Sequence, residues 1–379
     1  MTIPYEKLPS PCYVLDLARL RRNLRLIQEV QQRADISVIL ALKGFAMWRV
    51  FPLIREYLDG ATASSLHEAR LIYEEMGQRG HIYAPAYIPD EIDRILDYCS
   101  YITFNSLNQY RRFRHKVARH TPSVSPGLRV NPEYSDVGIA LYNPSSPASR
   151  LGTVMENLED GLPEGIEGLH FHTLCESPAT STVKAVDAFI YRYEHFFSQL
   201  KWVNFGGGHL MTRAGYDIDL LVNTLKRFRE EYGLKVILEP GSAVAWGCGE
   251  LVSTVLDIVD NRGTKTAILD ISFTAHMPDT LEMPYRPRVL GATDPIPGRP
   301  SYRLGAVSCL AGDFMTEYSF DHPLQEGDKV VFSDQMHYTM VKTSTFNGVR
   351  HPAIALWHED GRLELVREFG YEDYKNRLS

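Results

Sequence analysis

The fold is decided by the stretch Ile36-Ser37-Val38-Ile39-Leu40-Ala41-Leu42-Lys43-Gly44-Phe45. Its first seven residues are mostly apolar and partly β-branched, which is typical of a buried strand. Lys43 stands where this strand ends, and Gly44 lets the chain turn. An amine at the edge of an apolar strand loses its proton readily, because desolvation disfavours the ammonium form. Lys43 is therefore a candidate nucleophile for a Schiff base, although a lone lysine at a strand end is more often only solvated.

Short strands of this kind recur through the first two thirds of the chain, most of them separated by helix-length patterns. The eight runs begin at Ile36, Gly60, His81, Tyr101, Gly127, Gly168, Trp202 and Val236. Eight strand–helix units within about 210 residues predict a (β/α)8 TIM barrel. A doubly wound open sheet is the alternative.

The sequence changes character from about Gly249 onward. Predicted strands cover residues 251–260, 265–270 and 329–333, with turn signals between them and few helical patterns. We therefore predict an α/β barrel domain of residues 17–248, followed by a β-rich barrel or sandwich domain of residues 249–379. A strand within residues 1–16 is predicted to complete this second domain.

Composition excludes several classes of function. A net charge of -7 provides no basic footprint for nucleic acid. No run of about 18 apolar residues predicts a membrane span, and no signal-peptide core is found near the N terminus. The five cysteines are scattered without a C-x-x-C pair, so they predict neither a zinc site nor a disulfide framework. We expect a cytoplasmic protein that binds no metal, nucleic acid or membrane.

The predicted strand ends carry polar or backbone-exposing residues. They are Lys43, Ser65, Asn105, Asn131, His172, Gly206, Gly207, Gly208 and Glu239. In a barrel these C-terminal ends converge on one site. The three glycines can present N–H groups to an anion, and Glu239-Pro240-Gly241-Ser242 can close the same nest. A tight turn explains three glycines equally well, but two neighbouring glycine turns match the phosphate site of this fold.

An amine for a Schiff base, a phosphate nest and a carboxylate for a ring nitrogen point to pyridoxal 5′-phosphate. With these features the chain resembles the group IV, alanine-racemase-fold decarboxylases of basic amino acids. Among them it is most similar to the carboxynorspermidine/carboxyspermidine decarboxylases. The resemblance covers nearly the whole chain and rests on residues 41–45, 168–176, 202–209, 275–280, 309–313 and 345–348.

The resemblance implies a role for each matching residue. Lys43 would bind the cofactor covalently, His172 would stack on its ring, and Glu239 would pair with the ring nitrogen. The phosphate would be held by Gly206, Gly207, Gly208, Gly241 and Tyr338. Cys309 and Asp313 would reach the site of a second subunit, which implies a homodimer with shared active sites. Cys309 would return a proton, and Asp313 would hold the distal amine of the substrate.

Some residues depart from the family pattern. Ser242 stands where relatives commonly have an arginine, which makes one phosphate contact neutral. Cys175 replaces the serine of the ornithine-type enzymes, and Leu66-His67 replaces a pair of glycines. These departures concern the phosphate contacts rather than the identity of the cofactor.

The predicted substrate is a long polyamine with one amino-acid end, either carboxynorspermidine or carboxyspermidine. Each buried amine of such a substrate needs an acidic or strongly accepting partner. The predicted substrate-binding residues are Glu176, Glu239, His276, Asp279 and Asp313. Alternatively, Asp279 only caps the turn before Thr280.

Three other functions are alternatives to decarboxylation in polyamine biosynthesis. A racemase of the same fold needs two acid–base groups on opposite faces, and it leaves Cys309-x-x-x-Asp313 without a use. A non-catalytic cofactor carrier does not need a second domain to complete a substrate pocket. A barrel hydrolase needs paired carboxylates at strand ends, where Glu239 stands alone.

Overall fold

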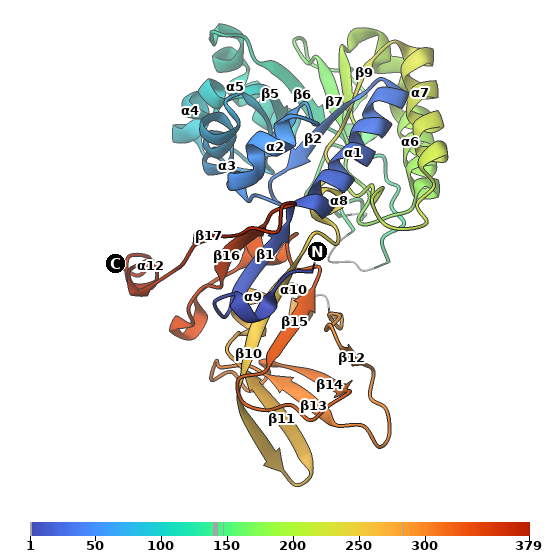
Figure 1. Cartoon of the computed structure of the whole chain (residues 1–379). Helices are drawn as coiled ribbons and strands as arrows, with labels where there is room; N and C mark the ends of the chain where they lie inside the picture. The colour runs from blue at the N-terminus through green and yellow to red at the C-terminus, as the bar shows by residue number, and fades with distance from the viewer. Residues whose placement is uncertain (1, 139–142, 147, 283) are drawn as a thin grey trace. The chain divides into compact units, whose positions relative to one another are not determined.

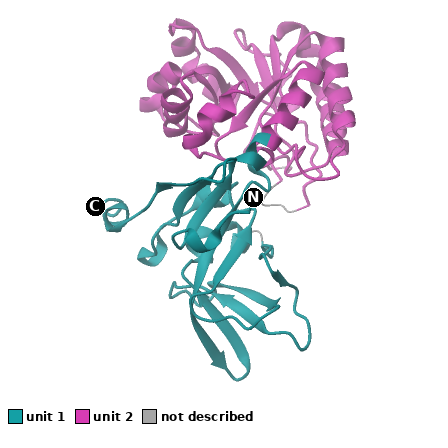
Figure 2. Cartoon of the chain, in the orientation of Figure 1, with its two compact units in different colours: residues 1–21, 245–379 teal, residues 22–244 magenta. Residues whose placement is uncertain are grey.

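The computed structural model describes residues 2–138, 143–146, 148–282 and 284–379. The chain forms two compact units, which we call the barrel unit (residues 22–244) and the sheet unit (residues 1–21 and 245–379) (Figure 2). The chain passes between them within helix α1 (Leu17–Ala34) and at the end of helix α8 (Ser242–Ala245). The domain limits predicted from the sequence remain predictions.

The barrel unit contains eight parallel strands that close on themselves, because β2 pairs with both β3 and β9. The strands are β2 (Ser37–Ala41), β3 (Gly60–Ala63), β4 (Gly80–Tyr83), β5 (Cys99–Phe104), β6 (Ser125–Arg129), β7 (Gly168–His170), β8 (Trp202–Asn204) and β9 (Lys235–Leu238). Helices lie outside them (Figure 1): α2 (Phe51–Arg55), α3 (Leu66–Leu71), α4 (Ile92–Tyr98), α5 (Leu107–Arg119), α6 (Ala179–Tyr193) and α7 (Ile218–Tyr232). The predicted TIM barrel is confirmed, and the open sheet is excluded.

Trp202 is a large side chain of the barrel interior, and strands β6 and β7 carry glycines where its indole lies. Trp202 of β8 is buried against Ile39 of β2 and Ile237 of β9. A Cβ atom on Gly168 would lie 2.1 Å from the Trp202 indole, and one on Gly127 would lie 2.3 Å from it. Non-bonded carbon atoms do not come this close to one another. Glycine is therefore required at both positions for the indole to fit.

Aromatic packing outside the barrel fixes the ends of β7 and β8. Phe171 directly precedes His172, and Phe205 directly precedes Gly206. The two phenylalanine rings lie 4.9 Å apart, and Phe189 of α6 packs on both at 4.7 and 6.0 Å. Since the rings are fully buried, the residues that follow them have defined positions.

Capping side chains determine where several helices begin. Asp16, directly before α1, accepts a hydrogen bond from the backbone N–H of Arg19 at 3.0 Å and so caps this helix. Ser65 and Ser106 cap α3 and α5 in the same way. Ser65 was expected among the converging strand ends, and the structure gives it this local role.

The sheet unit is built on a nine-stranded mixed sheet. Its strands are β1 (Cys12–Asp16), β10 (Gly249–Asn261), β11 (Thr264–Leu269), β12 (Ala292–Thr293), β13 (Ser301–Gly305), β14 (Phe314–Phe320), β15 (Lys329–Ser333), β16 (Ala353–Trp357) and β17 (Leu363–Arg367). The N-terminal strand β1 pairs antiparallel with β10 and parallel with β16. The predicted C-terminal β-rich domain, separate from the barrel, is confirmed.

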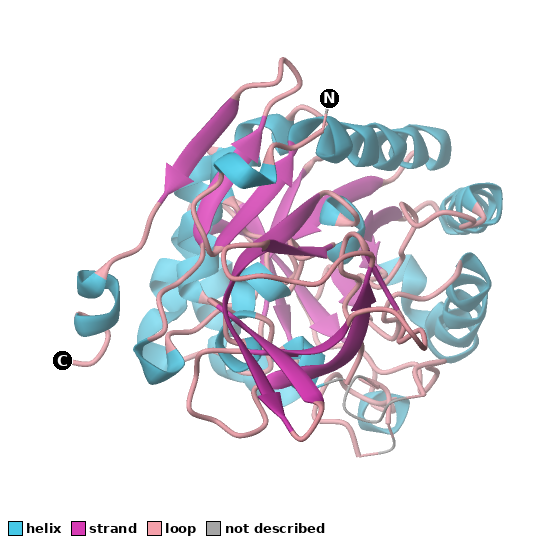
Figure 3. Ribbon diagram, turned by 60° about the horizontal axis from the view of Figure 1, so that its bottom comes forward, coloured by secondary structure: helices cyan, strands magenta, loops and turns pink. Residues whose placement is uncertain are grey.

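Short helices in the sheet unit were not predicted from the sequence. They are α9 (Phe273–His276), α10 (Asp279–Glu282), α11 (Thr339–Lys342) and α12 (Tyr371–Lys375). Each has only four or five residues. In Figure 3, where helices are cyan, α12 is the short helix next to the C terminus. A helix of one turn shows no 3.6-residue hydrophobic period, so pattern analysis does not detect it.

Candidate active site

The carboxyl ends of β2, β7, β8 and β9 bring the predicted barrel residues together. The amine nitrogen of Lys43 lies 3.4 Å from Nε2 of His172. The Lys43 side chain is accessible to solvent, yet protein surrounds it closely enough to change its ionisation. Burial first, and then the positive charge of Arg129, lower the pKa of the Lys43 amine. The site therefore favours the neutral, nucleophilic form.

Hydrogen bonding fixes the tautomer of His172. The backbone N–H of Gly207 donates to Nδ1 of His172 at 3.0 Å, so this ring nitrogen carries no proton. Burial and the charges of Lys43 and Arg129 hold the pKa of His172 well below its usual range. In the neutral ring the proton is then on Nε2, where it can be donated to the unprotonated Lys43 amine.

Glu239 is held by an asparagine that the sequence analysis did not assign. The Asn204 amide donates to Oε1 of Glu239 at 2.7 Å, and its own oxygen accepts from the Gly206 N–H at 2.8 Å. Burial raises the pKa of Glu239, while the Asn204 bond and the charges of Lys43 and Arg129 oppose this shift. An asparagine two residues before the first glycine of the turn was the available signal in the sequence.

The glycine turn after β8 offers only part of the predicted anion nest. Gly206 and Gly208 have φ of 67° and 94°, which glycine adopts without strain. The N–H groups of Gly206 and Gly207 are already used by Asn204 and His172. In the described part of the chain, the N–H of Gly208 donates to no protein acceptor.

The turn after β9 lies against the turn after β2. A Cβ atom on Gly44 would lie 2.8 Å from the Cα of Gly241, so position 44 needs glycine. Within the described residues, the N–H of Gly241 also donates to no protein acceptor. The donor set of an amine, an imidazole, a buried carboxylate and two available N–H groups fits pyridoxal 5′-phosphate.

A buried arginine supports this site from within the barrel. Arg129, at the end of β6, donates to the carbonyl of His172 at 3.2 Å. Its guanidinium lies 4.6 Å from the centroid of the Tyr83 ring. His170 is also buried, and neither of its ring nitrogens has a hydrogen-bond partner among the described residues. The sequence analysis did not assign Arg129, because it lies within a predicted strand. From the sequence alone, such a position is not distinguished from one that only fills the core.

Other predicted residues of the barrel unit have local partners. Asn105 accepts from the Tyr83 hydroxyl at 2.7 Å, and Asn131 accepts from the Glu133 N–H at 2.9 Å. The Ser242 hydroxyl, at the position of the expected arginine, donates to Glu176 at 3.3 Å. The substrate-binding role of Glu176 remains a prediction.

The predicted residues of the sheet unit differ in exposure. Cys309 is exposed, whereas Asp313 and His276 are buried. Asp279 forms an ion pair with Lys342. Tyr338 has φ of 51°, which is unusual for a bulky residue. The roles assigned to these residues remain predictions.

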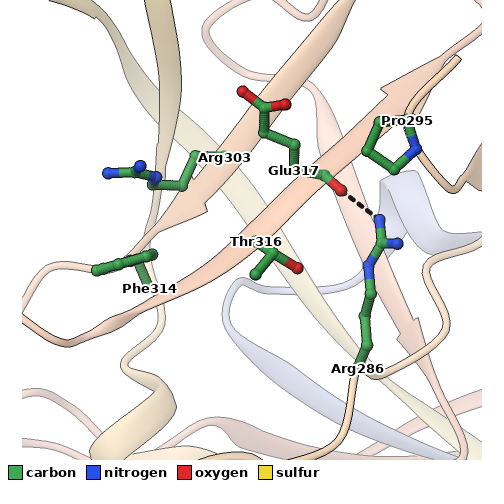
Figure 4. A pocket seen from close by; sticks show the side chains of 6 residues that line it. All are labelled: Arg286, Pro295, Arg303, Phe314, Thr316 and Glu317. Atoms are coloured by element: carbon green, nitrogen blue, oxygen red, sulfur yellow. Dashed lines mark hydrogen bonds between the residues drawn. The ribbon is translucent and has the colours of Figure 1, made fainter.

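The sheet unit also contains a hollow of about 360 Å³ (Figure 4). It is lined by Arg286, Pro295, Arg303, Phe314, Thr316 and Glu317. The Arg286 guanidinium bonds to the Glu317 carbonyl and lies 3.8 Å from the Tyr318 ring. Arg303 lies 4.5 Å from the Phe314 ring. Both cations contact protein groups and the lining contains no amine nucleophile, so this hollow is not the candidate active site.

The described residues offer neither a metal site nor a membrane span. Among them, no group of three or more His, Cys, Asp and Glu side chains could hold a metal ion. No helix in the described ranges is long and apolar enough to span a membrane.

Comparison with known proteins agrees with this geometry. A family model described as "Pyridoxal-dependent decarboxylase, C-terminal sheet domain" matches residues 12–335. The chain is 51% identical to the carboxyaminopropylagmatine decarboxylase of Synechocystis sp., over 98% of this chain and 96% of the relative. It is 43% identical to the carboxynorspermidine/carboxyspermidine decarboxylase of Campylobacter jejuni, over 98% and 99%.

A solved structure gives the same result. The carboxynorspermidine decarboxylase of Campylobacter jejuni, crystallised with norspermidine, superimposes with a TM-score of 0.91 at 42% identity, covering 98% of this chain and all of that one. The diaminopimelate decarboxylase of Helicobacter pylori, at 16% identity and a TM-score of 0.83, shares the fold. The chain therefore belongs to the pyridoxal-dependent decarboxylases, as an enzyme whose cofactor is pyridoxal 5′-phosphate.

Proposed function

We propose that this enzyme decarboxylates the amino-acid end of a carboxylated polyamine in polyamine biosynthesis. Carboxynorspermidine and carboxyspermidine are the substrates expected from the sequence, and norspermidine or spermidine plus CO2 are the products. The main support for this proposal comes from two relatives, 43% and 38% identical to this chain over 98% of its length. Both are named carboxynorspermidine/carboxyspermidine decarboxylase. In the reaction one C–C bond breaks, and a proton replaces the lost carboxyl group.

The barrel residues divide the chemistry between them. Lys43 would attach the cofactor, and the Nε2 proton of His172 would hold the amine in position. Glu239 would hold a proton at the ring nitrogen while Asn204 orients its carboxylate. The bound cofactor supplies an electron sink for the carbanion that remains when CO2 leaves. Cys309 would return a proton to the reacting carbon.

A second candidate substrate is carboxyaminopropylagmatine. It is favoured by the relative of 51% identity, whose name specifies this compound. Its tail ends in a planar guanidinium, whereas the tails of carboxynorspermidine and carboxyspermidine end in a primary ammonium. Each of these tail groups requires a carboxylate partner in the protein. A guanidinium favours a carboxylate that accepts two parallel hydrogen bonds from it.

We expect kcat/KM for carboxylated polyamines to exceed that for ornithine and lysine by about 100-fold or more, since a site with buried acidic partners disfavours substrates that leave them unpaired. Steady-state assays with carboxynorspermidine, carboxyspermidine, carboxyaminopropylagmatine, ornithine and lysine measure this. Equal values for ornithine would contradict the proposal. The ranking of the guanidinium substrate against the two ammonium substrates decides between the candidates.

The same assay tests Asp279. Its carboxylate pairs with Lys342, which also pairs with Glu282. Asp279→Asn should reduce the preference for carboxylated polyamines, and Glu282→Gln is the matched control because it removes only the other partner of Lys342. If Asp279→Asn leaves the preference unchanged, Asp279 has no part in binding the substrate.

We further propose a cytoplasmic homodimer with shared active sites. A cytoplasmic location is supported by five scattered cysteines without a pairing motif. The dimer is supported by exposed apolar side chains close to Cys309. Val307 and Leu310 flank it, and the Cys309 N–H donates to Asn347 at 2.9 Å, directly after the exposed Phe346. Apolar groups gathered around a functional thiol are typical of a surface covered by a partner.

Mixing two inactive variants tests the sharing. In a dimer of Lys43→Ala and Cys309→Ala chains, one of the two sites has both residues intact. Random exchange should therefore restore about one quarter of wild-type activity in a symmetric dimer. Mixing Lys43→Ala with Lys43→Arg is the control and should restore none. No recovery after confirmed subunit exchange would count against shared sites.

A further inference from the structure

We propose that Asp313 is a positioning residue, which fixes the loop that carries the Cys309 thiol and does not bind a substrate amine. The inference rests on the proposed function, because it takes Cys309 to act in decarboxylation. It assigns Asp313 a different role from the one that the family resemblance implied.

The Asp313 carboxylate is occupied by neutral donors of its own chain. Its Oδ1 accepts from the Thr274 N–H at 3.0 Å, and its Oδ2 accepts from the Ser272 hydroxyl at 2.8 Å. The Ser308 hydroxyl donates to the same Oδ2. Asp313 is only 4% exposed, and these three donors are a backbone N–H and two hydroxyls, all of them neutral. Three of roughly four acceptor positions are therefore filled.

These bonds close the loop on both sides of the cysteine. Ser308 precedes Cys309 and is bound through its hydroxyl to the Asp313 carboxylate. The Asp313 N–H donates to the carbonyl of Leu310 at 3.0 Å, and the Leu310 N–H donates to the Ser308 hydroxyl at 3.4 Å. The carboxylate thus joins the loop to the segment of Ser272 and Thr274.

Asn347 holds the loop from another segment. It has φ of 60° and ψ of 13°, the left-handed region that asparagine tolerates better than most residues. From there its side-chain oxygen accepts the Cys309 N–H at 2.9 Å. Asp313 and Asn347 together fix the backbone on which the exposed thiol stands.

This arrangement is poorly suited to binding an amine. A substrate ammonium that reached the buried carboxylate would compete with the donors already there. A displaced hydroxyl or N–H that stays buried is costly. An exposed thiol four residues before a buried, satisfied carboxylate is instead the arrangement expected when the carboxylate orders the loop.

Hydrogen exchange tests the positioning role without depending on activity. We expect amide exchange in a peptide of residues 305–314 to be about 10-fold faster in Asp313→Ala than in wild type, because lost acceptors lower the cost of local opening. Asn347→Gly, which keeps the left-handed backbone but loses the acceptor, should also accelerate it. Asn347→Asp keeps the acceptor and should not. Asp321→Asn, an exposed aspartate paired with Arg299, is the charge-loss control.

Kinetics separate positioning from amine binding. Asp313→Ala should lower kcat by about 10- to 100-fold through a misplaced thiol, with KM changed by less than about twofold. Asp313→Asn should recover most of kcat, because its amide oxygen can still accept the Thr274 N–H. An amine ligand would behave differently, since both variants would raise KM equally and leave exchange unchanged.

The two proposals fail in different ways. Unchanged exchange in a folded Asp313→Ala variant overturns the inference, even if the wild-type enzyme decarboxylates carboxylated polyamines. A wild-type enzyme that converts none of these substrates overturns the proposed function. In that case accelerated exchange in Asp313→Ala still supports the loop-fixing part of the inference.

Discussion

Replacement of Lys43 by alanine is expected to lower kcat by about 1000-fold or more, because the variant has no amine to attach the cofactor covalently. The expectation follows from an amine with a lowered pKa, 3.4 Å from a histidine nitrogen that can donate to it. The enzyme-bound visible absorbance should be lost together with activity. Absorbance spectra and steady-state assays of the purified variant measure both effects.

Two further variants test the cause of this loss. Lys43→Arg keeps a positive charge but has no deprotonated amine near neutral pH, so it should be as inactive as Lys43→Ala. Lys235→Ala removes an exposed lysine at the opposite end of a barrel strand and should leave activity intact. Borohydride reduction of the wild-type enzyme should leave the pyridoxyl group on the Lys43 peptide. A label on a different lysine would overturn the assignment.

The barrel and part of its site could be predicted because both depend on local patterns. Short apolar runs indicate buried strands, and parallel strands place their carboxyl ends at one face. Lys43, His172 and Glu239 stand directly after such runs, and the structure brings Lys43 and His172 together. No knowledge of side-chain packing was needed for these residues.

Predicted strands nevertheless extend beyond the observed ones. The apolar pattern after β7 and β8 continues through Phe171 and Phe205, although the strands end at His170 and Asn204. Their rings pack against Phe189 of α6, and their N–H groups still donate to the carbonyls of Asn204 and Ile237 at 2.9 Å. The hydrophobic pattern indicates which side chains are buried, and burial here continues one residue beyond the regular strand.

Residues with inward or distant partners escaped prediction. Asn204 and Arg129 act through side chains on strands, where a polar residue gives no indication of which way it faces. The partner of Asp313, Ser272, lies 41 residues earlier, and Asp279 pairs with Lys342, 63 residues later. Spacing along a single sequence does not reveal such pairs, which depend on the folded sheet unit.

Charge reduces the number of candidate substrates but does not identify the substrate. The acidic residues predicted to bind the substrate favour a cationic tail, since a buried charge needs a partner. The same argument applies to an ammonium and to a guanidinium, so carboxyaminopropylagmatine was not distinguished from the predicted substrates. The relative of 51% identity raised this candidate, and only assays rank it.

Replacement of Glu239 by glutamine is expected to lower kcat by about 100- to 1000-fold, the range found when one preorganised electrostatic group is removed. The change keeps the size of the side chain and an oxygen that can accept the Asn204 amide at 2.7 Å in the wild type. It removes the charge that would hold a proton at the ring nitrogen. Steady-state kcat with the preferred polyamine substrate measures the effect.

Asn204→Ala provides the matched comparison for Glu239→Gln. It keeps the carboxylate but removes the amide that orients it and that accepts the Gly206 N–H. We expect a smaller fall, about 10- to 30-fold, because orientation is lost while the charge remains. Both variants should keep the enzyme-bound visible absorbance, since Lys43 is intact. If Glu239→Gln retains kcat within about threefold of wild type, charge at this position is not needed, and Glu239 serves only to tie the turns after β8 and β9.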